Sequence, residues 1–202
     1  MGDKISKLYD PDMREALFSL YEGMNERLRF FEELVIGKSR ADAILVRENE
    51  IVGFEIKSDM DSLVRLEKQV KNYERFCDRC YIVTGVHYAD RIDDYVPKHW
   101  GIYEVSLTDN GEYHIEMSRE AVHNPKERPR VKLKNQMSLL WRSELVSIIR
   151  TNKYGGVSGK NKRILKEQII EKAGDSLARR FTYDALIERD YSIYRKEDGD
   201  ES

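Results

Sequence analysis

The feature that most constrains this chain's fold is a pair of short apolar segments joined by a tight polar turn. Residues 40–47 and 51–57 are rich in branched and apolar side chains, and Glu48-Asn49-Glu50 separates them. This pattern predicts two antiparallel strands that form a hairpin. Because side chains alternate between the faces of a strand, Glu55 and Lys57 are expected on one face of the second strand. The opposite face carries only apolar side chains, those of Val52, Phe54 and Ile56.

The hairpin is expected to bring Asp42, on its first strand, close to Glu55 and Lys57. Neighbouring carboxylates repel each other, and a hard divalent cation relieves that repulsion while keeping bound waters. Such a cation lowers the pKa of a bound water and offsets charge on a phosphoryl oxygen. The carbonyl of Ile56 is a further candidate ligand, and Lys57 would assist the water or the transition state. These parts suit phosphodiester hydrolysis; the alternative is a surface hairpin with an ordinary Glu–Lys pair.

Turn and capping signals predict a mixed α/β domain over residues 1–123. Asp10-Pro11 predicts a helix start with Asp10 as the N-cap, and Asp109-Asn110-Gly111 predicts a hairpin turn. The remaining expected elements are strands at 28–36, 80–84, 100–106 and 113–117, a helix after residue 61 and a short helix at 90–95. The order indicates a mixed central sheet flanked by helices.

The composition changes beyond residue 123. Residues 124–136 predict a polar, proline-bearing linker, residues 137–195 a basic helical extension, and residues 196–202 a disordered acidic tail. Helices are expected at 137–150, 162–173 and 176–189, with a glycine-rich turn at 154–159.

The net charge is only −2, but residues 126–180 hold 15 Lys and Arg against 5 Asp and Glu. A basic segment of this kind is typical of a surface that binds a polyanion. Its candidate contacts to a nucleic-acid backbone are Lys160, Lys162, Arg163 and Lys166. The helix–turn–helix layout resembles small DNA-binding modules of the SAP type, and the alternative is a packing extension of the core.

Several classes of protein are excluded by the composition. The 202 residues contain no apolar run near the roughly 18 residues that a membrane span needs. The first residues, Met1-Gly2-Asp3-Lys4, lack the pattern of a signal peptide, so a cytoplasmic protein is expected. Cys77 and Cys80 have the spacing of a zinc half-site, but the chain has no second such pair. They are therefore predicted to be buried thiols.

Arg40-Ala41-Asp42, followed by Phe54-Glu55-Ile56-Lys57-Ser58, resembles the signature of the PD-(D/E)XK nuclease superfamily, which has the restriction-endonuclease-like fold. Ala41 stands where the name-giving proline of the signature would lie, a position that carries no chemistry. Residues 65–73 are similar to the helix that follows the signature, and residues 96–102 are similar to a small bacterial and phage branch. The resemblance covers roughly residues 10–120.

The resemblance implies a nuclease that uses Mg²⁺ or Mn²⁺ to cleave duplex or branched DNA, in repair, recombination or phage defence. Asp42, Glu55, Lys57 and Gln69 would be catalytic, and Asp42, Glu55 and the Ile56 carbonyl would hold the metal. A further acid is expected from Glu33 or, less favoured, Glu15, and nucleic-acid contacts are expected from Arg40 and Arg65. A homodimer is one way to cut both strands, and no organic cofactor is expected. The alternatives are a non-catalytic nucleic-acid-binding or regulatory protein on the same fold, and a purely structural protein.

Overall fold

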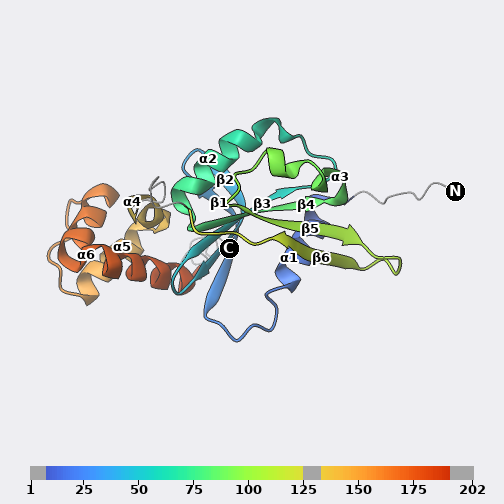
Figure 1. Ribbon diagram of the computed structural model, residues 1–202. Helices are drawn as coiled ribbons and strands as arrows, with labels where there is room; N and C mark the ends of the chain where they lie inside the picture. Colours follow the sequence, from blue (N-terminus) through green and yellow to red (C-terminus); the bar gives the residue numbers. More distant parts are fainter. Residues whose placement is uncertain (1–7, 125–132, 192–202) are drawn as a thin grey trace, which may run out of the picture.

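The computed structural model describes residues 8–124 and 133–191, and its centre is a six-stranded sheet (Figure 1). The strands lie in chain order, with β3, β4 and β5 parallel and every other neighbouring pair antiparallel. They are β1 (Leu28–Ile36), β2 (Ser39–Arg47), β3 (Ile51–Lys57), β4 (Arg79–Gly85), β5 (Gly101–Leu107) and β6 (Tyr113–Arg119). The predicted class, α/β with a mixed central sheet flanked by helices, is confirmed.

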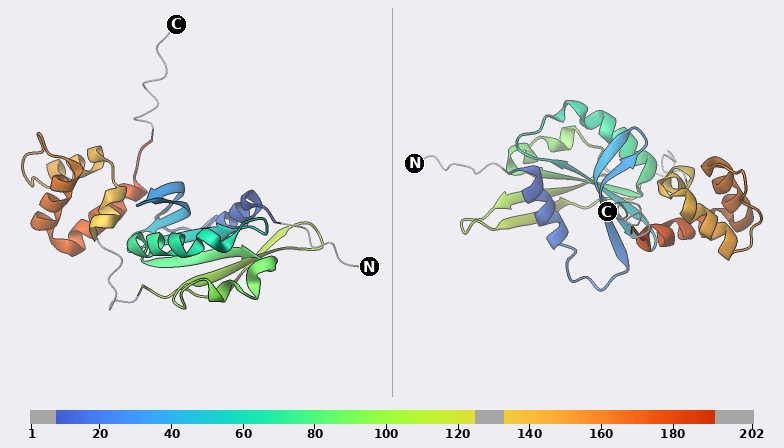
Figure 2. Two further views of the ribbon diagram at one scale, coloured as in Figure 1. Left: turned by 90° about the horizontal axis from the view of Figure 1, so that it is seen from above. Right: turned by 180° about the vertical axis from the view of Figure 1, so that it is seen from behind.

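Helices cover both faces of the sheet, as the views in Figures 1 and 2 show. α1 (Asp10–Ser19) contacts β3, β4 and β6 on one face, and α2 (Leu66–Phe76) contacts β1 to β4 on the other. The apolar side chains predicted to share one face of β3, those of Val52, Phe54 and Ile56, belong to the core beneath α1. By the alternation of the strand, Glu55 and Lys57 face the α2 layer.

Two predicted helix boundaries are wrong. The N-cap of α1 is Tyr9, whose backbone N–H donates to the Asp12 carboxylate at 3.0 Å, while Asp10 is the first helical residue and pairs with Arg14. The short helix expected at 90–95 is replaced by α3 (Val86–Ala89) and a 3₁₀ turn, η2 (Ile92–Asp94). A further 3₁₀ turn, η1 (Leu63–Arg65), precedes α2.

The C-terminal helices are α4 (Leu133–Gln136), α5 (Arg142–Thr151) and α6 (Lys162–Ile187), with a 3₁₀ turn, η3 (Met137–Leu139), after α4. The helix expected at 137–150 is interrupted because Leu140 and Trp141 are extended, and the Trp141 N–H donates to the Glu144 carboxylate at 2.6 Å. The two helices expected at 162–173 and 176–189 are present within α6, where they are joined at Gly174, whose φ of 74° and ψ of 166° are not helical.

These helices pack together beyond one end of the sheet (Figure 2) and share its apolar core on the α2 side. Asp78 Oδ2 accepts hydrogen bonds from Ile51 N at 2.8 Å, Gln136 Nε2 at 3.0 Å and Tyr183 Oη at 3.1 Å. The side chain of Arg189 donates to Glu144 and lies 4.2 Å from the centre of the Trp141 ring. Apolar and polar contacts thus fix the helices to the sheet.

Most of the expected linker, residues 125–132, and the expected acidic tail, residues 196–202, lie outside the described residues. The domain boundaries therefore stay a prediction. Within the described part of the chain, no helix is both long and apolar enough to cross a membrane.

Candidate active site

The candidate site lies where β2 and β3 separate. Their pairing ends at Ala43 and Phe54. One residue further on, Asp42 N donates to Tyr73 Oη at 3.0 Å, and Tyr73 Oη donates to Phe54 O at 2.8 Å. A Cβ on Gly53 would lie 2.5 Å from the Tyr73 ring, so only glycine allows the ring this close to the strand. Tyr73 of α2 therefore bridges the two strands at the point where they part.

Asp42 is held by a neighbouring backbone amide. Its Oδ2 accepts from Ile56 N at 2.8 Å, and its Oδ1 lies 3.8 Å from Arg14 Nη2. Burial raises the pKa of Asp42, while the Ile56 amide and the charges of Lys57 and Arg14 act in the opposite direction. The carboxylate is thus held in place through Oδ2 by the backbone of β3.

Glu55 and Lys57 form a buried pair. Lys57 Nζ donates to Glu55 Oε1 at 2.5 Å, and neither residue is more than 7% exposed. Burial and, after it, the charge of Asp42 raise the pKa of Glu55 to about 7, although Lys57 acts in the opposite direction. Glu55 Oε2 is buried and accepts no hydrogen bond from any residue that the structure describes. A buried carboxylate oxygen in this state is costly unless a ligand binds it.

Gln69 reaches the same region from α2. It lines a pocket with Asp42, and its Oε1 is also buried without a hydrogen-bond partner among residues 8–124 and 133–191. The structure thus brings Asp42, Glu55, Lys57 and Gln69 to the separated end of the hairpin. Their roles stay a prediction, since a common location does not establish chemistry.

Of the two further acids expected, only Glu33 lies at the pocket. It stands in β1 opposite the strand break, with a left-handed φ of 54°, and its carboxylate pairs with Arg14 at 2.8 Å and Arg40 at 2.6 Å. Glu15 is exposed and does not line the pocket. Asp10 does line it. The sequence did not indicate Asp10 as a site residue, because its position before Pro11 is typical of a helix N-cap.

Arg14 is a second residue that the sequence did not reveal. Its Nη1 donates to Asp42 O at 2.7 Å, its Nη2 donates to Glu33 Oε1, and its Nε pairs with Asp10. The four-residue spacing from Asp10 predicts an ion pair along the helix. The contacts to β1 and β2 depend on how α1 packs on the sheet, and the spacing of residues along the helix does not reveal that packing.

Four exposed cations, Lys38, Arg40, Arg65 and Lys68, line the pocket and are called its basic rim below. Five of the ten lining residues are Arg or Lys and three are Asp or Glu. The complete lining is Asp10, Arg14, Glu33, Lys38, Ser39, Arg40, Asp42, Arg65, Lys68 and Gln69. Three of the cations, Lys38, Arg65 and Lys68, form no side-chain ion pair within the described parts of the chain. Unpaired cations around a pocket favour a polyanionic ligand.

The basic residues predicted in the C-terminal extension lie elsewhere. Lys162 Nζ donates to Ser138 O and Lys166 Nζ to Lys134 O, each at 3.1 Å. Lys160 Nζ donates to Gln168 Oε1 at 2.7 Å, and Arg163 pairs with Glu167 at 3.2 Å. None of the four lines the pocket that holds Asp42. The candidate nucleic-acid contacts therefore form two separate groups.

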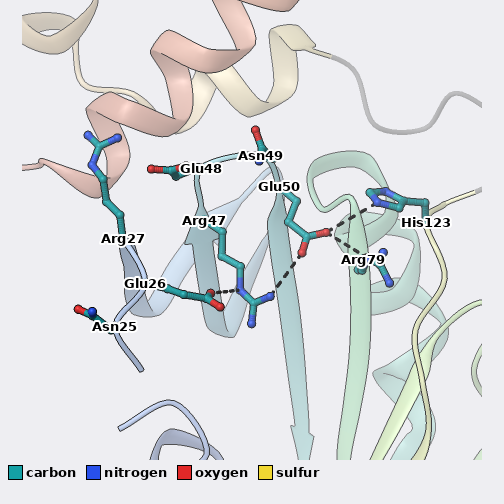
Figure 3. A pocket seen from close by; sticks show the side chains of 9 residues that line it. All are labelled: Asn25, Glu26, Arg27, Arg47, Glu48, Asn49, Glu50, Arg79 and His123. Carbon is teal, nitrogen blue, oxygen red and sulfur yellow. Dashed lines mark hydrogen bonds and ion pairs between the residues drawn. The ribbon is translucent and has the colours of Figure 1, made fainter. Parts of the chain in front are cut away.

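A different pocket surrounds the turn between β2 and β3 (Figure 3). At its centre Glu50 pairs with Arg79 at 3.1 Å and lies 3.8 Å from both Arg47 and His123. Arg27 points toward α6, where it pairs with Asp184 (Figure 3). Three arginines and three glutamates line this pocket, so its charges are balanced and it offers little to an anion.

Metal-ligand groups of other kinds are absent from the described residues. No cluster of three or more His, Cys, Asp and Glu side chains is arranged there to hold a metal ion. Cys77 and Cys80 are free, buried thiols, as predicted. A cation at the separated end of the hairpin would therefore draw on two carboxylates, Asp42 and Glu55, together with oxygens of other kinds.

Comparison with protein families gives one assignment. The family model described as bacteriophage P4 protein cII matches residues 7–196, and the chain belongs to this family. No curated protein matches the chain.

Among solved structures, the chain is similar to Pyrococcus furiosus SfsA in complex with Ca²⁺, at 18% identity and a TM-score of 0.30. The match covers 54% of this chain and 59% of SfsA, so the chain spans well under two thirds of that protein. A similarity this weak does not bear on function.

Proposed function

We propose that the chain is a metal-dependent nuclease of the PD-(D/E)XK type that hydrolyses phosphodiester bonds in DNA. One observation carries the proposal: buried Glu55 lies in the same strand break as Asp42, binds Lys57 through one oxygen, and has no hydrogen-bond partner among the described residues on the other. A buried carboxylate oxygen without a hydrogen bond does not stabilise the fold, whereas a cation site requires such an oxygen as a ligand. The sequence signature around residues 40–58 supports the same reading.

The residues present fit Mg²⁺ or Mn²⁺. Both ions prefer oxygen ligands and bind through one or two carboxylates while keeping several waters. Asp42 Oδ1 and Glu55 Oε2 are the oxygens left after the Ile56 amide and Lys57 are bound. The Ile56 carbonyl is a further candidate ligand, and Glu33 is a weaker one because two arginines already hold it. When bound, the cation would lower the pKa of a water and offset phosphoryl charge.

The protein's own groups have separate tasks in this proposal. Lys57, fixed by Glu55, would orient the attacking water or donate to a phosphoryl oxygen as charge develops. Gln69, with its buried amide oxygen, would position the water. Tyr73 would keep β2 and β3 apart at the site, since burial raises its pKa well above the usual value and keeps the hydroxyl a donor to Phe54 O.

The basic rim is the basis for the substrate. Arg40, Arg65 and their neighbours Lys38 and Lys68 would bind backbone phosphates on either side of the scissile bond. The lysines of the C-terminal extension would add phosphate contacts further along a duplex or branched DNA. We place the protein in the cytoplasm, in repair, recombination or phage defence, with two copies needed if both strands are cut.

Cation binding tests this function before any substrate is known. The melting temperature of the full chain is measured with and without Mn²⁺ or Mg²⁺, for wild type, Glu55→Gln and Asp42→Asn. The proposal predicts a rise in wild type and none in either variant. A rise that is equal in all three proteins would place the cation elsewhere and contradict the proposal.

The alternative function is a non-catalytic nucleic-acid-binding protein, favoured by the basic rim alone. It predicts DNA binding that does not respond to Mn²⁺ and is unchanged in Glu55→Gln.

A further inference from the structure

Arg14 is a cation inside the acidic cluster to which the proposed function gives no task. Its side chain is 14% exposed, and it contacts acids from three elements. Nη2 lies 2.8 Å from Glu33 Oε1 and 3.8 Å from Asp42 Oδ1, Nη1 donates to Asp42 O, and Nε pairs with Asp10. A divalent cation bound at Asp42 would therefore compete with the guanidinium for the same carboxylate.

Two roles for Arg14 are to be compared, to hold Asp42 in place or to act on it through charge. The other contacts of Asp42 distinguish them. The Asp42 carboxylate is fixed by Ile56 N and its backbone N–H is bound to Tyr73 Oη, so neither anchor depends on Arg14. Loss of the guanidinium leaves Asp42 placed and removes one positive charge 3.8 Å from its free oxygen. The electrostatic consequence therefore outweighs the positional one.

We propose that Arg14 is the resident counter-ion of the site: it neutralises the acidic cluster and thereby weakens, and so sets, the affinity for a divalent cation. The inference rests on the proposed function, because it concerns the same cation. A unit charge a few ångströms from a metal ligand should change cation affinity by at least about tenfold. With Arg14 in place, a bound divalent cation also leaves the pocket more positive toward a phosphate.

Arg40 provides a matched control. It pairs with the other oxygen of the same Glu33 at 2.6 Å, but its side chain is 67% exposed. It belongs to the basic rim, and its charge is screened by water. Neutralising Arg40 therefore removes the same type of charge from the same carboxylate and should leave cation affinity nearly unchanged.

The test is calorimetric titration of the full chain with Mn²⁺ near neutral pH, for wild type, Arg14→Gln, Arg14→Met, Arg14→Lys and Arg40→Gln. The two neutral Arg14 variants should bind Mn²⁺ about tenfold more tightly than wild type. Arg14→Lys and Arg40→Gln should stay within about twofold of wild type. Circular dichroism reports whether each variant is folded, and Arg14→Met preserves the packing of the stem if Arg14→Gln does not fold.

Equal or weaker binding in a folded neutral variant would overturn the inference, as would failure of both neutral variants to fold. Those results leave the proposed function standing if wild type binds Mn²⁺. If wild type shows no binding and the neutral variants do bind, the counter-ion role is supported while the proposed metal dependence of the wild-type protein fails. Absence of binding in every protein would reject both.

Discussion

Two buried carboxylates near opposite ends of the β2–β3 hairpin, those of Asp78 and Glu55, differ in how completely they are hydrogen-bonded. At the turn end, Asp78 accepts three hydrogen bonds from Ile51, Gln136 and Tyr183, and it fixes the C-terminal helices to the sheet. At the separated end, Glu55 Oε2 and Gln69 Oε1 are buried and accept no hydrogen bond within the part of the chain that the structure describes. Asp78 thus belongs to a hydrogen-bonded network at one end, whereas the groups at the other end leave these two oxygens unsatisfied.

This difference separates stability from function. Satisfied buried polar groups contribute to the fold, and removing one of them leaves others unpaired. Unsatisfied buried groups cost stability and persist at sites where a ligand completes them. Variants at the turn end should therefore lower stability without changing chemistry, and variants at the separated end should change chemistry without lowering stability.

The largest effect is expected at the separated end. Asp42→Asn keeps an oxygen that accepts from Ile56 N but removes the charge that a cation needs. Cleavage of DNA in single-turnover assays should fall by about a thousandfold, the scale expected when a key electrostatic group is lost. The melting temperature without metal should change little. Cleavage within tenfold of wild type would contradict the assigned role.

The next effect belongs to the turn end. Asp78→Ala leaves Ile51 N, Gln136 and Tyr183 without their acceptor, and chemical denaturation should show a loss of about 4 kcal/mol in the free energy of unfolding. Cleavage per folded molecule should be unchanged. A loss of cleavage in protein that is still folded would show that the two ends are coupled.

Glu55→Gln should stabilise the metal-free protein in a pH-dependent way. The pKa of Glu55 is raised by burial to about 7 in the folded state from its ordinary 4.5, so the folded protein holds this proton more tightly. Its contribution to stability is present below pH 4.5 and is lost as the pH rises toward 7.

In a chelator, Glu55→Gln should therefore exceed wild type in stability by about 2 kcal/mol at pH 8 and by little at pH 5. Glu15→Gln, on the exposed surface of α1, is the control and should track wild type at both values. A Glu55→Gln advantage that does not vary with pH would show that Glu55 is not the titrating group.

The smallest expected effect compares the two basic groups. Arg65→Gln with Lys68→Gln removes two unpaired rim charges, and the slope of log affinity for DNA against log salt should fall by about two. Lys162→Gln with Lys166→Gln should change the slope less, since both ammonium groups already donate to backbone carbonyls. Equal changes in the slope would show that Lys162 and Lys166 contribute as much to DNA binding as Arg65 and Lys68.

The sequence predicted the hairpin and its charged face because period-two alternation and a three-residue turn are local. The resemblance of residues 65–73 to the helix that follows the signature implied Gln69 as a site residue, and Gln69 lines the pocket with Asp42. The sequence could not predict Arg14 and Asp10, because their contacts depend on how α1 lies against β1 and β2. Tyr73 looked like an ordinary core position of a helix, and its bridging hydroxyl became evident only with the strands in place.

Errors in the C-terminal half have a similar origin. The break at Leu140 and Trp141 contradicts the local periodicity, and it is stabilised by the Glu144 carboxylate and by Arg189 stacking on the Trp141 ring. Arg189 lies near the end of the C-terminal extension, so the sequence around residue 140 does not reveal the contact that stabilises the break. Tertiary contacts determined helix boundaries here, whereas the site depended mainly on a local hairpin.

The central claim is that Asp42, Glu55 and Lys57 form one cleavage site. The most direct measurement is cleavage of linear, supercoiled, branched and single-stranded DNA with Mg²⁺ or Mn²⁺, by wild type and Lys57→Ala. We expect wild type to cleave at least one of these substrates and Lys57→Ala to cleave none while remaining folded. Equal cleavage by the two proteins, or none by wild type on any substrate, would contradict the account.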